Sequence, residues 1–174
     1  MSTKTLISVE DFDRLEEDEF RYELDAGELI TLTRPSTDHG RIERRLLMVL
    51  QTYLESRGVG EAFGANILFV LGSNTKRAPD VSVVFREVGS VKEITGAPDI
   101  AAEILSPSNS KREMKRKLGQ FFAIGCKLAW IIDPKTRTID VWESASGPSR
   151  TLRESDSLET PLLPGFACPI AKLF

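Results

Sequence analysis

The sequence is poor in the residues that most often build metal and redox sites. It contains one histidine, His39, and two cysteines, Cys126 and Cys168, among 174 residues. A single histidine excludes zinc sites made of several imidazoles, and a Ser-His-Asp triad would depend on that one residue. The cysteines stand far apart, so the sequence indicates neither a thiolate metal site nor a disulfide framework. We therefore expect a reducing, cytoplasmic setting and chemistry that uses carboxylates, lysine or hydroxyls.

Long apolar runs and an excess of positive charge are also missing. No apolar run approaches the roughly 20 residues that span a bilayer, and the start has no basic segment followed by an apolar one. We expect a protein that is neither secreted nor embedded in a membrane. The 23 Lys and Arg residues stand against 26 Asp and Glu residues, which gives a net charge of −3. Because a generic phosphate-binding protein is basic overall, any contact with nucleic acid must be local.

The pattern of apolar residues predicts one α/β domain over residues 1–174. At this length a single core buries roughly two thirds of the surface of the unfolded chain. The expected elements are a short helix over 8–19, a hairpin over 20–31, a helix over 42–57, strands at 67–71, 81–85 and 100–105, a helix from about 111 to 124, and strands at 128–132 and 138–143. This order predicts a mixed β-sheet flanked by helices, with an N-terminal β-hairpin.

Capping residues mark several of the expected helix ends. Ser8 with Asp11 three residues later is typical of a helix N-terminus, and the run 106–110 is expected to cap the helix that follows it. Gly125 is expected to end that helix in a left-handed conformation. The segment 147–164 is rich in turn residues and polar.

Glu103 is the most informative anomaly, because it lies inside the apolar run Ile100–Leu105. A carboxylate within a buried strand is costly unless something compensates its charge. Asp80 stands at the start of the preceding strand, and adjacent strands would bring both carboxylates to one end of a sheet. Such a pair either shares a proton or binds a cation, and carboxylate oxygens favour Mg²⁺, Mn²⁺ or Ca²⁺. The alternative is structural: Asp80 caps a strand, and Glu103 pairs with an arginine at a sheet edge.

Lys117 lies within the apolar stripe of the next helix. The stripe consists of Met114, Leu118, Phe121 and Gly125. A lysine in this stripe points toward the sheet, where its ammonium can sit beside the carboxylates; alternatively it snorkels to water. Asp, Glu and Lys together form the arrangement needed for metal-assisted cleavage of phosphodiesters.

The helix that carries Lys117 is strongly basic. Its five basic residues and one acid, Glu113, give a local charge of five minus one, or +4; the bases are Lys111, Arg112, Lys115, Arg116 and Lys117. We take Lys111, Arg112 and Lys115 as candidates for phosphate binding, which the net charge does not provide. The alternative is an ordinary solvated helix face.

A series of short motifs, in a fixed order, covers nearly the whole chain. The motifs are Tyr22–Leu29, His39–Ile42, Pro79–Val84, Glu103–Ser108, Lys117, Trp130–Pro134, Leu163–Phe166 and Leu173–Phe174. Together they resemble the Uma family, whose members are assigned as bacterial endonucleases in the restriction-endonuclease-like PD-(D/E)XK superfamily. The resemblance implies a restriction-endonuclease-like core and a divalent-metal-dependent endonuclease. It further implies Mg²⁺ with Mn²⁺ as a substitute, nucleic acid as partner with DNA favoured over RNA, and a homodimer whose paired sites cut two strands.

The resemblance also implies roles for single residues. Asp80 and Glu103 match the metal-binding acids, and the backbone carbonyl of Ile104 matches a further metal ligand. The usual lysine would stand two residues after Glu103, where this chain has Leu105. Lys117, on the following helix, matches the position that replaces it.

Two residues near the N-terminus match the family as accessory positions. Glu23 matches an acid of the front hairpin that reaches the site or a second metal. His39 matches a position for which two roles stay open: part of the catalytic site, or a residue at a helix N-terminus that bonds to a turn.

Two other functions stay open on the sequence alone. One is a noncatalytic nucleic-acid-binding or protein-interaction module that retains the nuclease fold. The other is a structural partner in which Glu103 pairs with an arginine and Lys117 points to solvent.

Overall fold

A computed structural model of the chain describes residues 6–16, 20–106 and 111–174, without the side chain of Lys111. The helices are α1 (Val9–Phe12), α2 (Thr37–Arg57), α3 (Lys111–Ala123) and the 3-10 helix η1 (Ile170–Lys172). The strands are β1 (Arg21–Asp25), β2 (Glu28–Leu32), β3 (Glu61–Gly64), β4 (Phe69–Gly72), β5 (Thr75–Arg77), β6 (Val81–Val84), β7 (Ile94–Thr95), β8 (Ile100–Ile104), β9 (Leu128–Asp133), β10 (Thr138–Trp142), β11 (Pro148–Leu152), β12 (Ser157–Leu158) and β13 (Cys168–Pro169). Within these residues, no helix is long and apolar enough to cross a membrane.

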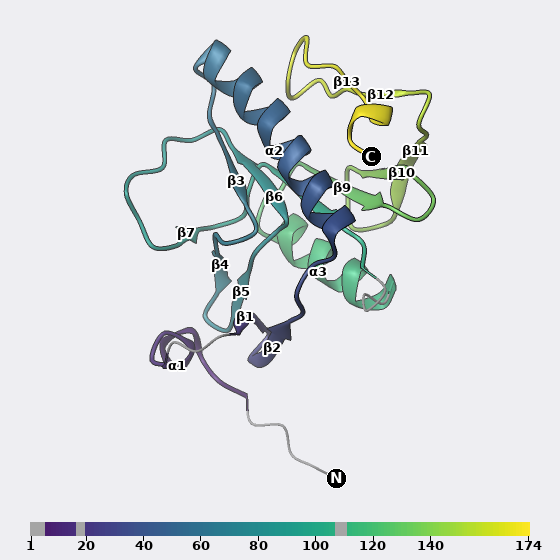
Figure 1. Ribbon diagram of the computed structural model, residues 1–174. Coiled ribbons are helices and arrows are strands. Elements are labelled where there is room, and N and C mark those ends of the chain that lie inside the picture. Colours follow the sequence, from purple (N-terminus) through teal and green to yellow (C-terminus); the bar gives the residue numbers. More distant parts are fainter. Residues whose placement is uncertain (1–5, 17–19, 107–110) are drawn as a thin grey trace.

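Two large sheets organise the molecule (Figure 1). The six-stranded sheet has the order β11-β10-β9-β8-β6-β3, in which only the β8–β9 pair is parallel. The five-stranded sheet has the order β2-β1-β5-β4-β7 and contains the N-terminal hairpin. Strands β12 and β13 pair with each other in a third, small sheet. The mixed α/β architecture with an N-terminal hairpin therefore agrees with the sequence pattern.

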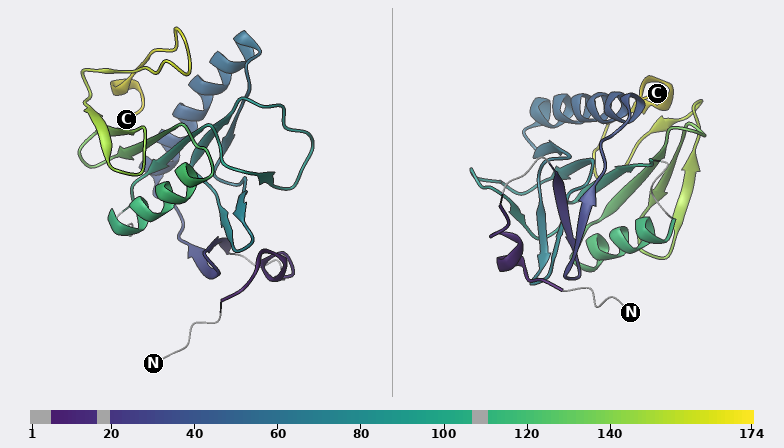
Figure 2. Two further views of the ribbon diagram at one scale, coloured as in Figure 1. Left: turned by 180° about the vertical axis from the view of Figure 1, so that it is seen from behind. Right: turned by 60° about the horizontal axis from the view of Figure 1, so that its bottom comes forward.

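The six-stranded sheet lies between two helices, with α2 over one face and α3 over the other (Figure 2). Successive side chains of a strand point to opposite faces, so each buried strand supplies both cores. In β8, Ile100, Ala102 and Ile104 join the core under α2, whereas Ala101 joins the core under α3. The same alternation directs Glu103 toward α3.

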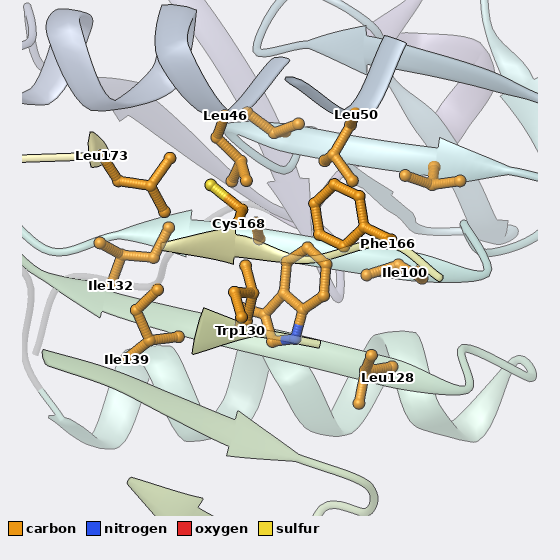
Figure 3. Packing of buried hydrophobic residues seen from close by; sticks show 14 of the residues in the cluster. Leu46, Leu50, Ile100, Leu128, Trp130, Ile132, Ile139, Phe166, Cys168 and Leu173 are labelled. Atoms are coloured by element: carbon orange, nitrogen blue, oxygen red, sulfur yellow. The ribbon is translucent and has the colours of Figure 1, made fainter. Parts of the chain in front are cut away.

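The core under α2 is closed by the C-terminal segment (Figure 3). Trp130 of β9 is fully buried among Leu46 and Leu50 of α2. Phe166 and Leu173, which follow the polar segment 147–164, complete the same cluster. The end of the chain thus contributes to the core although the segment before it is polar.

The hairpin and α2 follow from local signals in the sequence. Strands β1 and β2 pair in full antiparallel register around a two-residue turn, in which Ala26 and Gly27 both have positive φ, as the right-handed twist of a tight hairpin requires. Helix α2 is longer than predicted because it starts at Thr37, after the Ser36 side chain caps it. It ends at Gly58, whose φ of 62° is left-handed.

The prediction of a helix over 8–19 is wrong in length. The Ser8–Asp11 capping box is present, but α1 ends at Phe12, and none of its residues is buried. A helix without a buried face gains no packing energy to offset the cost of its formation. Residues 17–19 and most of the predicted cap at 106–110 lie outside the described residues, whereas Gly125 has the expected positive φ of 103°.

Six of the strands were not predicted from the sequence. These are β3, β5, the two-residue β7, β11, β12 and β13, and β11 lies in the segment 147–164 that was expected to be rich in turn residues. The strand expected at 67–71 is β4, which pairs with β5 in the sheet of the hairpin. Strand β5 reads Thr-Lys-Arg yet is entirely buried, so it is held by its two strand neighbours and by ion pairs rather than by an apolar face.

Candidate active site

Strand pairing brings the two predicted acids together. Strand β6 runs antiparallel to β8 with Val81 opposite Ala102, and continuing this register by one residue places Asp80 opposite Glu103. Asp80 Oδ2 accepts a hydrogen bond of 2.7 Å from the N–H of Ile104. Asp80, Glu103 and the backbone of Ile104 therefore meet at one end of the sheet.

Lys117 reaches this point from α3. Its Nζ lies 2.7 Å from Glu103 Oε1 and 2.9 Å from Glu23 Oε1, and it donates a hydrogen bond of 2.9 Å to the carbonyl of Ala78. The side chain is only 14% exposed, so the lysine points to the sheet instead of snorkelling. Among the described residues, the charged partner of Glu103 is this lysine and not an arginine. The arrangement differs from the one expected of a purely structural Glu103.

Glu23 is buried beside Lys117 on the hairpin strand β1. It is 2% exposed, and its Oε1 also accepts the N–H of Ala78 at 2.9 Å. Its Oε2 accepts a hydrogen bond of 2.9 Å from Arg77 Nη1. The structure thus brings Glu23 into the cluster through a lysine, an arginine and a backbone amide.

His39 stands at the N-terminus of α2 and satisfies both expected placements. Its backbone N–H donates to the Ser36 side chain, which caps the helix, and its Nε2 lies 3.2 Å from Asp80 Oδ1. Burial acts most strongly and lowers the pKa of His39, but the hydrogen bond and charge of Asp80 and the charge of Glu43 outweigh it and raise the pKa. His39 Nδ1 is buried without a hydrogen-bond partner among the described residues.

The electrostatics show that the cluster is short of positive charge. Burial, the charge of Asp80 and the charge of Glu23 raise the pKa of Glu103 to about 8, against the opposing effect of Lys117. For Lys117, burial acts to lower the pKa, but the nearby carboxylates outweigh it and raise the pKa above its ordinary value. For Glu23, burial acts to raise the pKa, but the charges of Lys117 and Arg77 outweigh it and lower the pKa. Glu103, Glu23 and Asp80 share Lys117, and the second cation, Arg77, also pairs with Asp25, so the cluster favours one additional proton or cation.

A pocket of about 110 Å³ opens onto these groups. Its lining includes Glu23, His39, Asp80, Glu103, Ile104 and Lys117. In the described part of the chain, no three His, Cys, Asp or Glu side chains form a group that could hold a metal ion. Two carboxylates and a carbonyl still suit Mg²⁺, which usually keeps several waters and takes one or two carboxylates with substrate phosphates. The volume leaves room for an ion and a few oxygen atoms, since a water occupies roughly 30 Å³.

Two of the three candidates for phosphate binding do not line the pocket. Arg112 and Lys115 are exposed on α3 and are not among the described residues that line the pocket. The side chain of Lys111 is outside the described part of the structure. Their contact with phosphate stays a prediction.

Comparison with known proteins places the chain in a family. The family model Uma2, described as "Putative restriction endonuclease", matches residues 9–171. The chain belongs to the Uma2 family. The solved structures include a similar one, of a "putative nuclease belonging to DUF820 from Anabaena variabilis ATCC 29413", with a TM-score of 0.83, 24% identity and 97% of each chain covered. This likeness shows the fold, and no match was found among curated proteins. The family resemblance expected from the motifs is thus confirmed.

Two polar residues of this Uma2 chain, Arg77 and Gln120, enter the site without having been predicted. Arg77 of β5 is 4% exposed and contacts both Glu23 and Asp25. Gln120 of α3 bonds to Arg77 and Asp25. The only signal for Arg77 in the sequence was its position three residues before Asp80. Arg77 also follows another basic residue, Lys76, and two adjacent basic residues do not indicate burial.

Proposed function

We propose that this Uma2 chain is a divalent-metal-dependent endonuclease that hydrolyses nucleic-acid phosphodiester bonds. The observation that supports this most is the pairing of the half-buried Asp80 with the buried Glu103, whose Oε1 lies 2.7 Å from Lys117 Nζ. A buried carboxylate cluster that is short of positive charge is suited to bind a hard cation. A perturbed carboxyl in a pocket beside a lysine is also the type of group that catalysis uses.

Asp80, Glu103 and the backbone carbonyl of Ile104 would hold the ion, with Mg²⁺ preferred and Mn²⁺ as a substitute. When bound, such an ion lowers the pKa of water and stabilises negative charge on the phosphate. The chain prepares Asp80 for this role, because the Ile104 N–H and His39 Nε2 each contact a different oxygen of Asp80 and fix its plane.

Lys117 is the candidate for orienting the attacking water or a phosphate oxygen. Its ammonium has three protons and donates a hydrogen bond to the Ala78 carbonyl, and the carboxylates of Glu103 and Glu23 form ion pairs with it. Lys117 would contact a substrate when one of these three oxygens no longer accepts a proton of the ammonium group. A cation in the pocket would bind Glu103. Glu103 would then pair with the cation in place of Lys117, and Lys117 could pair with the substrate.

The substrate contact outside the pocket is assigned to basic residues of α3. Lys111, Arg112 and Lys115 would bind phosphates on either side of the reacting one, and this binding would weaken with rising salt. The description of the family favours DNA over RNA. A homodimer would allow two such sites to cut two strands.

The test is cleavage of plasmid and single-stranded substrates by the wild type and by variants, in Mg²⁺, in Mn²⁺ and with a chelator. We expect metal-dependent cleavage by the wild type and a loss of about 100-fold or more in Lys117→Ala and Asp80→Asn. Lys135→Ala, which removes an exposed lysine in the β9–β10 turn, is the control and should cleave like the wild type. Absence of metal-dependent cleavage on every substrate would contradict the proposal and support the noncatalytic module.

A further inference from the structure

Lys117 Nζ contacts Glu23 as well as Glu103 and the Ala78 carbonyl. A lysine side chain is long and flexible, so its place on α3 brings the ammonium near the sheet but does not aim it. Glu23 is itself immobilised: its Oε1 lies 2.9 Å from Lys117 Nζ and accepts the Ala78 N–H, and its Oε2 accepts from Arg77. Whatever holds Glu23 in place therefore also aims Lys117.

Arg77 holds Glu23 as part of a closed set of contacts. Its Nη1 donates to Glu23 at 2.9 Å, its Nη2 contacts Asp25 Oδ2, and its Nε donates to Gln120 Oε1 at 2.8 Å. Gln120 Nε2 completes the set with a hydrogen bond of 2.8 Å to Asp25 Oδ1. Arg77 is 4% exposed and its guanidinium group is planar, so these contacts allow only one orientation of that group.

The contacts join three elements around the site. Glu23 and Asp25 lie on β1, Arg77 lies on β5, and Gln120 lies on α3 one turn after Lys117. The arginine therefore ties the helix that carries the lysine to the strand that carries its acceptor. We refer to Arg77, Asp25 and Gln120 as the Arg77 bracket.

We propose that the Arg77 bracket positions Glu23, and that Glu23 in turn aims Lys117 at Glu103. Glu23 is a positioning residue in this arrangement and not the ligand of a second metal: Ala78 N–H and Lys117 Nζ contact its Oε1, and Arg77 Nη1 contacts its Oε2. This inference rests on the proposed function only in that it takes Lys117 as the group that acts on the substrate.

The competing explanation is that the bracket merely stabilises the fold, and the chain offers a matched control for it. Lys76 precedes Arg77 on the same strand, is 0% exposed and likewise pairs with two carboxylates, Asp13 and Glu93. No contact joins it to Lys117 among the described residues. Lys76→Met therefore removes a buried cation of β5 without touching the site.

The experiment observes the ammonium group of Lys117 directly in the metal-free, ¹⁵N-labelled protein. A buried ammonium with three acceptors exchanges its protons slowly and gives an Nζ signal, which Lys117→Met assigns by its loss. We expect Arg77→Met and Glu23→Gln to shift or broaden this signal, and Lys76→Met to leave it unchanged. Arg77→Lys should behave like Arg77→Met, because it keeps the charge but loses the fork.

Kinetics and metal binding give the second measurement. In Arg77→Met and Glu23→Gln, kcat should fall by about 10- to 100-fold while KM stays at its wild-type value. If Arg77→Met does not fold, Gln120→Leu replaces it, since that variant opens the bracket without leaving a charge unpaired. If Lys76→Met does not fold, Asp13→Asn serves as the control.

Several results would overturn the inference. One is an unchanged Lys117 signal in both Arg77→Met and Glu23→Gln, and another is an equal change in Lys76→Met. A loss of Mn²⁺ affinity in Glu23→Gln with an unchanged Lys117 signal would assign Glu23 to a metal instead. If the wild type cleaves no substrate, the proposed function fails, but the Lys117 signal still decides whether the bracket positions the lysine.

Discussion

Replacing Glu103 by glutamine tests whether the cluster needs an additional cation. Burial and the neighbouring carboxylates raise the pKa of Glu103 from 4.5 to about 8. The folded protein binds the Glu103 proton more tightly than the unfolded chain does. The proton therefore stabilises the folded state fully below pH 4.5, and this stabilisation is lost as the pH rises to about 8. At about 1.4 kcal/mol per unit of pKa, the free energy of unfolding should fall by roughly 5 kcal/mol at most across this window. Glutamine resembles the protonated acid and does not ionise.

We therefore expect metal-free Glu103→Gln to lose this pH dependence and to be more stable than the wild type at pH 9. The assay is denaturant unfolding at a series of pH values between 4 and 9. Glu93→Gln removes a carboxylate that also pairs with a buried lysine, Lys76, but lies outside the pocket, so it should keep the wild-type dependence.

Mn²⁺ should narrow the difference in stability between the wild type and Glu103→Gln. At 100 times its dissociation constant it should stabilise the wild type by about 2.7 kcal/mol and Glu103→Gln by much less. At pH 7, where Glu103 is protonated in the metal-free protein, binding should release about one proton, measured by calorimetry in buffers of different ionisation enthalpy. Equal pH dependence in wild type and Glu103→Gln, together with no proton release, would refute the reasoning that the cluster is short of positive charge.

Three further predictions concern the fold and its cysteines. Leu46→Ala, at a fully buried position under α2, should lower the free energy of unfolding by about 2–5 kcal/mol, whereas Met48→Ala, at a position 56% exposed on the same helix, should change it by less than about 0.5 kcal/mol in denaturant titrations. Gly60→Ala should reduce the melting temperature far more than Gly72→Ala, because a Cβ at position 60 would lie 2.4 Å from a carbonyl oxygen of β6 at a φ of 134°, while Gly72 has open space. Burial raises the pKa of the Cys126 thiol to about 11, so a thiol reagent at pH 8 should react with it far more slowly than with the unfolded chain, and equal rates would contradict its burial.

Local patterns explain most of what could be predicted about the elements. The hairpin follows from alternation around Ala26 and Gly27, and most of α2 follows from the apolar spacing over 42–57, although its start at Thr37 was not predicted. These signals involve only neighbouring residues, so they do not depend on tertiary contacts with the rest of the chain. The predicted helix over 8–19 was too long because its formation depends on tertiary packing. A helix of that length needs a buried face, and no residue of α1 is buried.

The acids of the site could also be predicted, because Glu103 is anomalous in its own strand. A charge within an apolar run stands out without knowledge of its partners, and the order of strands indicates that Asp80 lies nearby. Glu23 and His39 carried no such signal of their own and were placed by family resemblance. Arg77 was missed, since β5 has no apolar pattern and its burial results from pairing with β1 and β4.

The sequence by itself determined the periodicity of the elements, several helix caps and the presence of a carboxylate, Glu103, inside an apolar strand. Only the tertiary structure decided how that carboxylate is compensated. The decisive contacts join residues far apart in the chain: Glu23 and Arg77 are separated by 54 positions, and Asp25 and Gln120 by 95. A contact of this kind leaves no local pattern, because each partner is an ordinary polar residue until the two sheets and α3 bring them together.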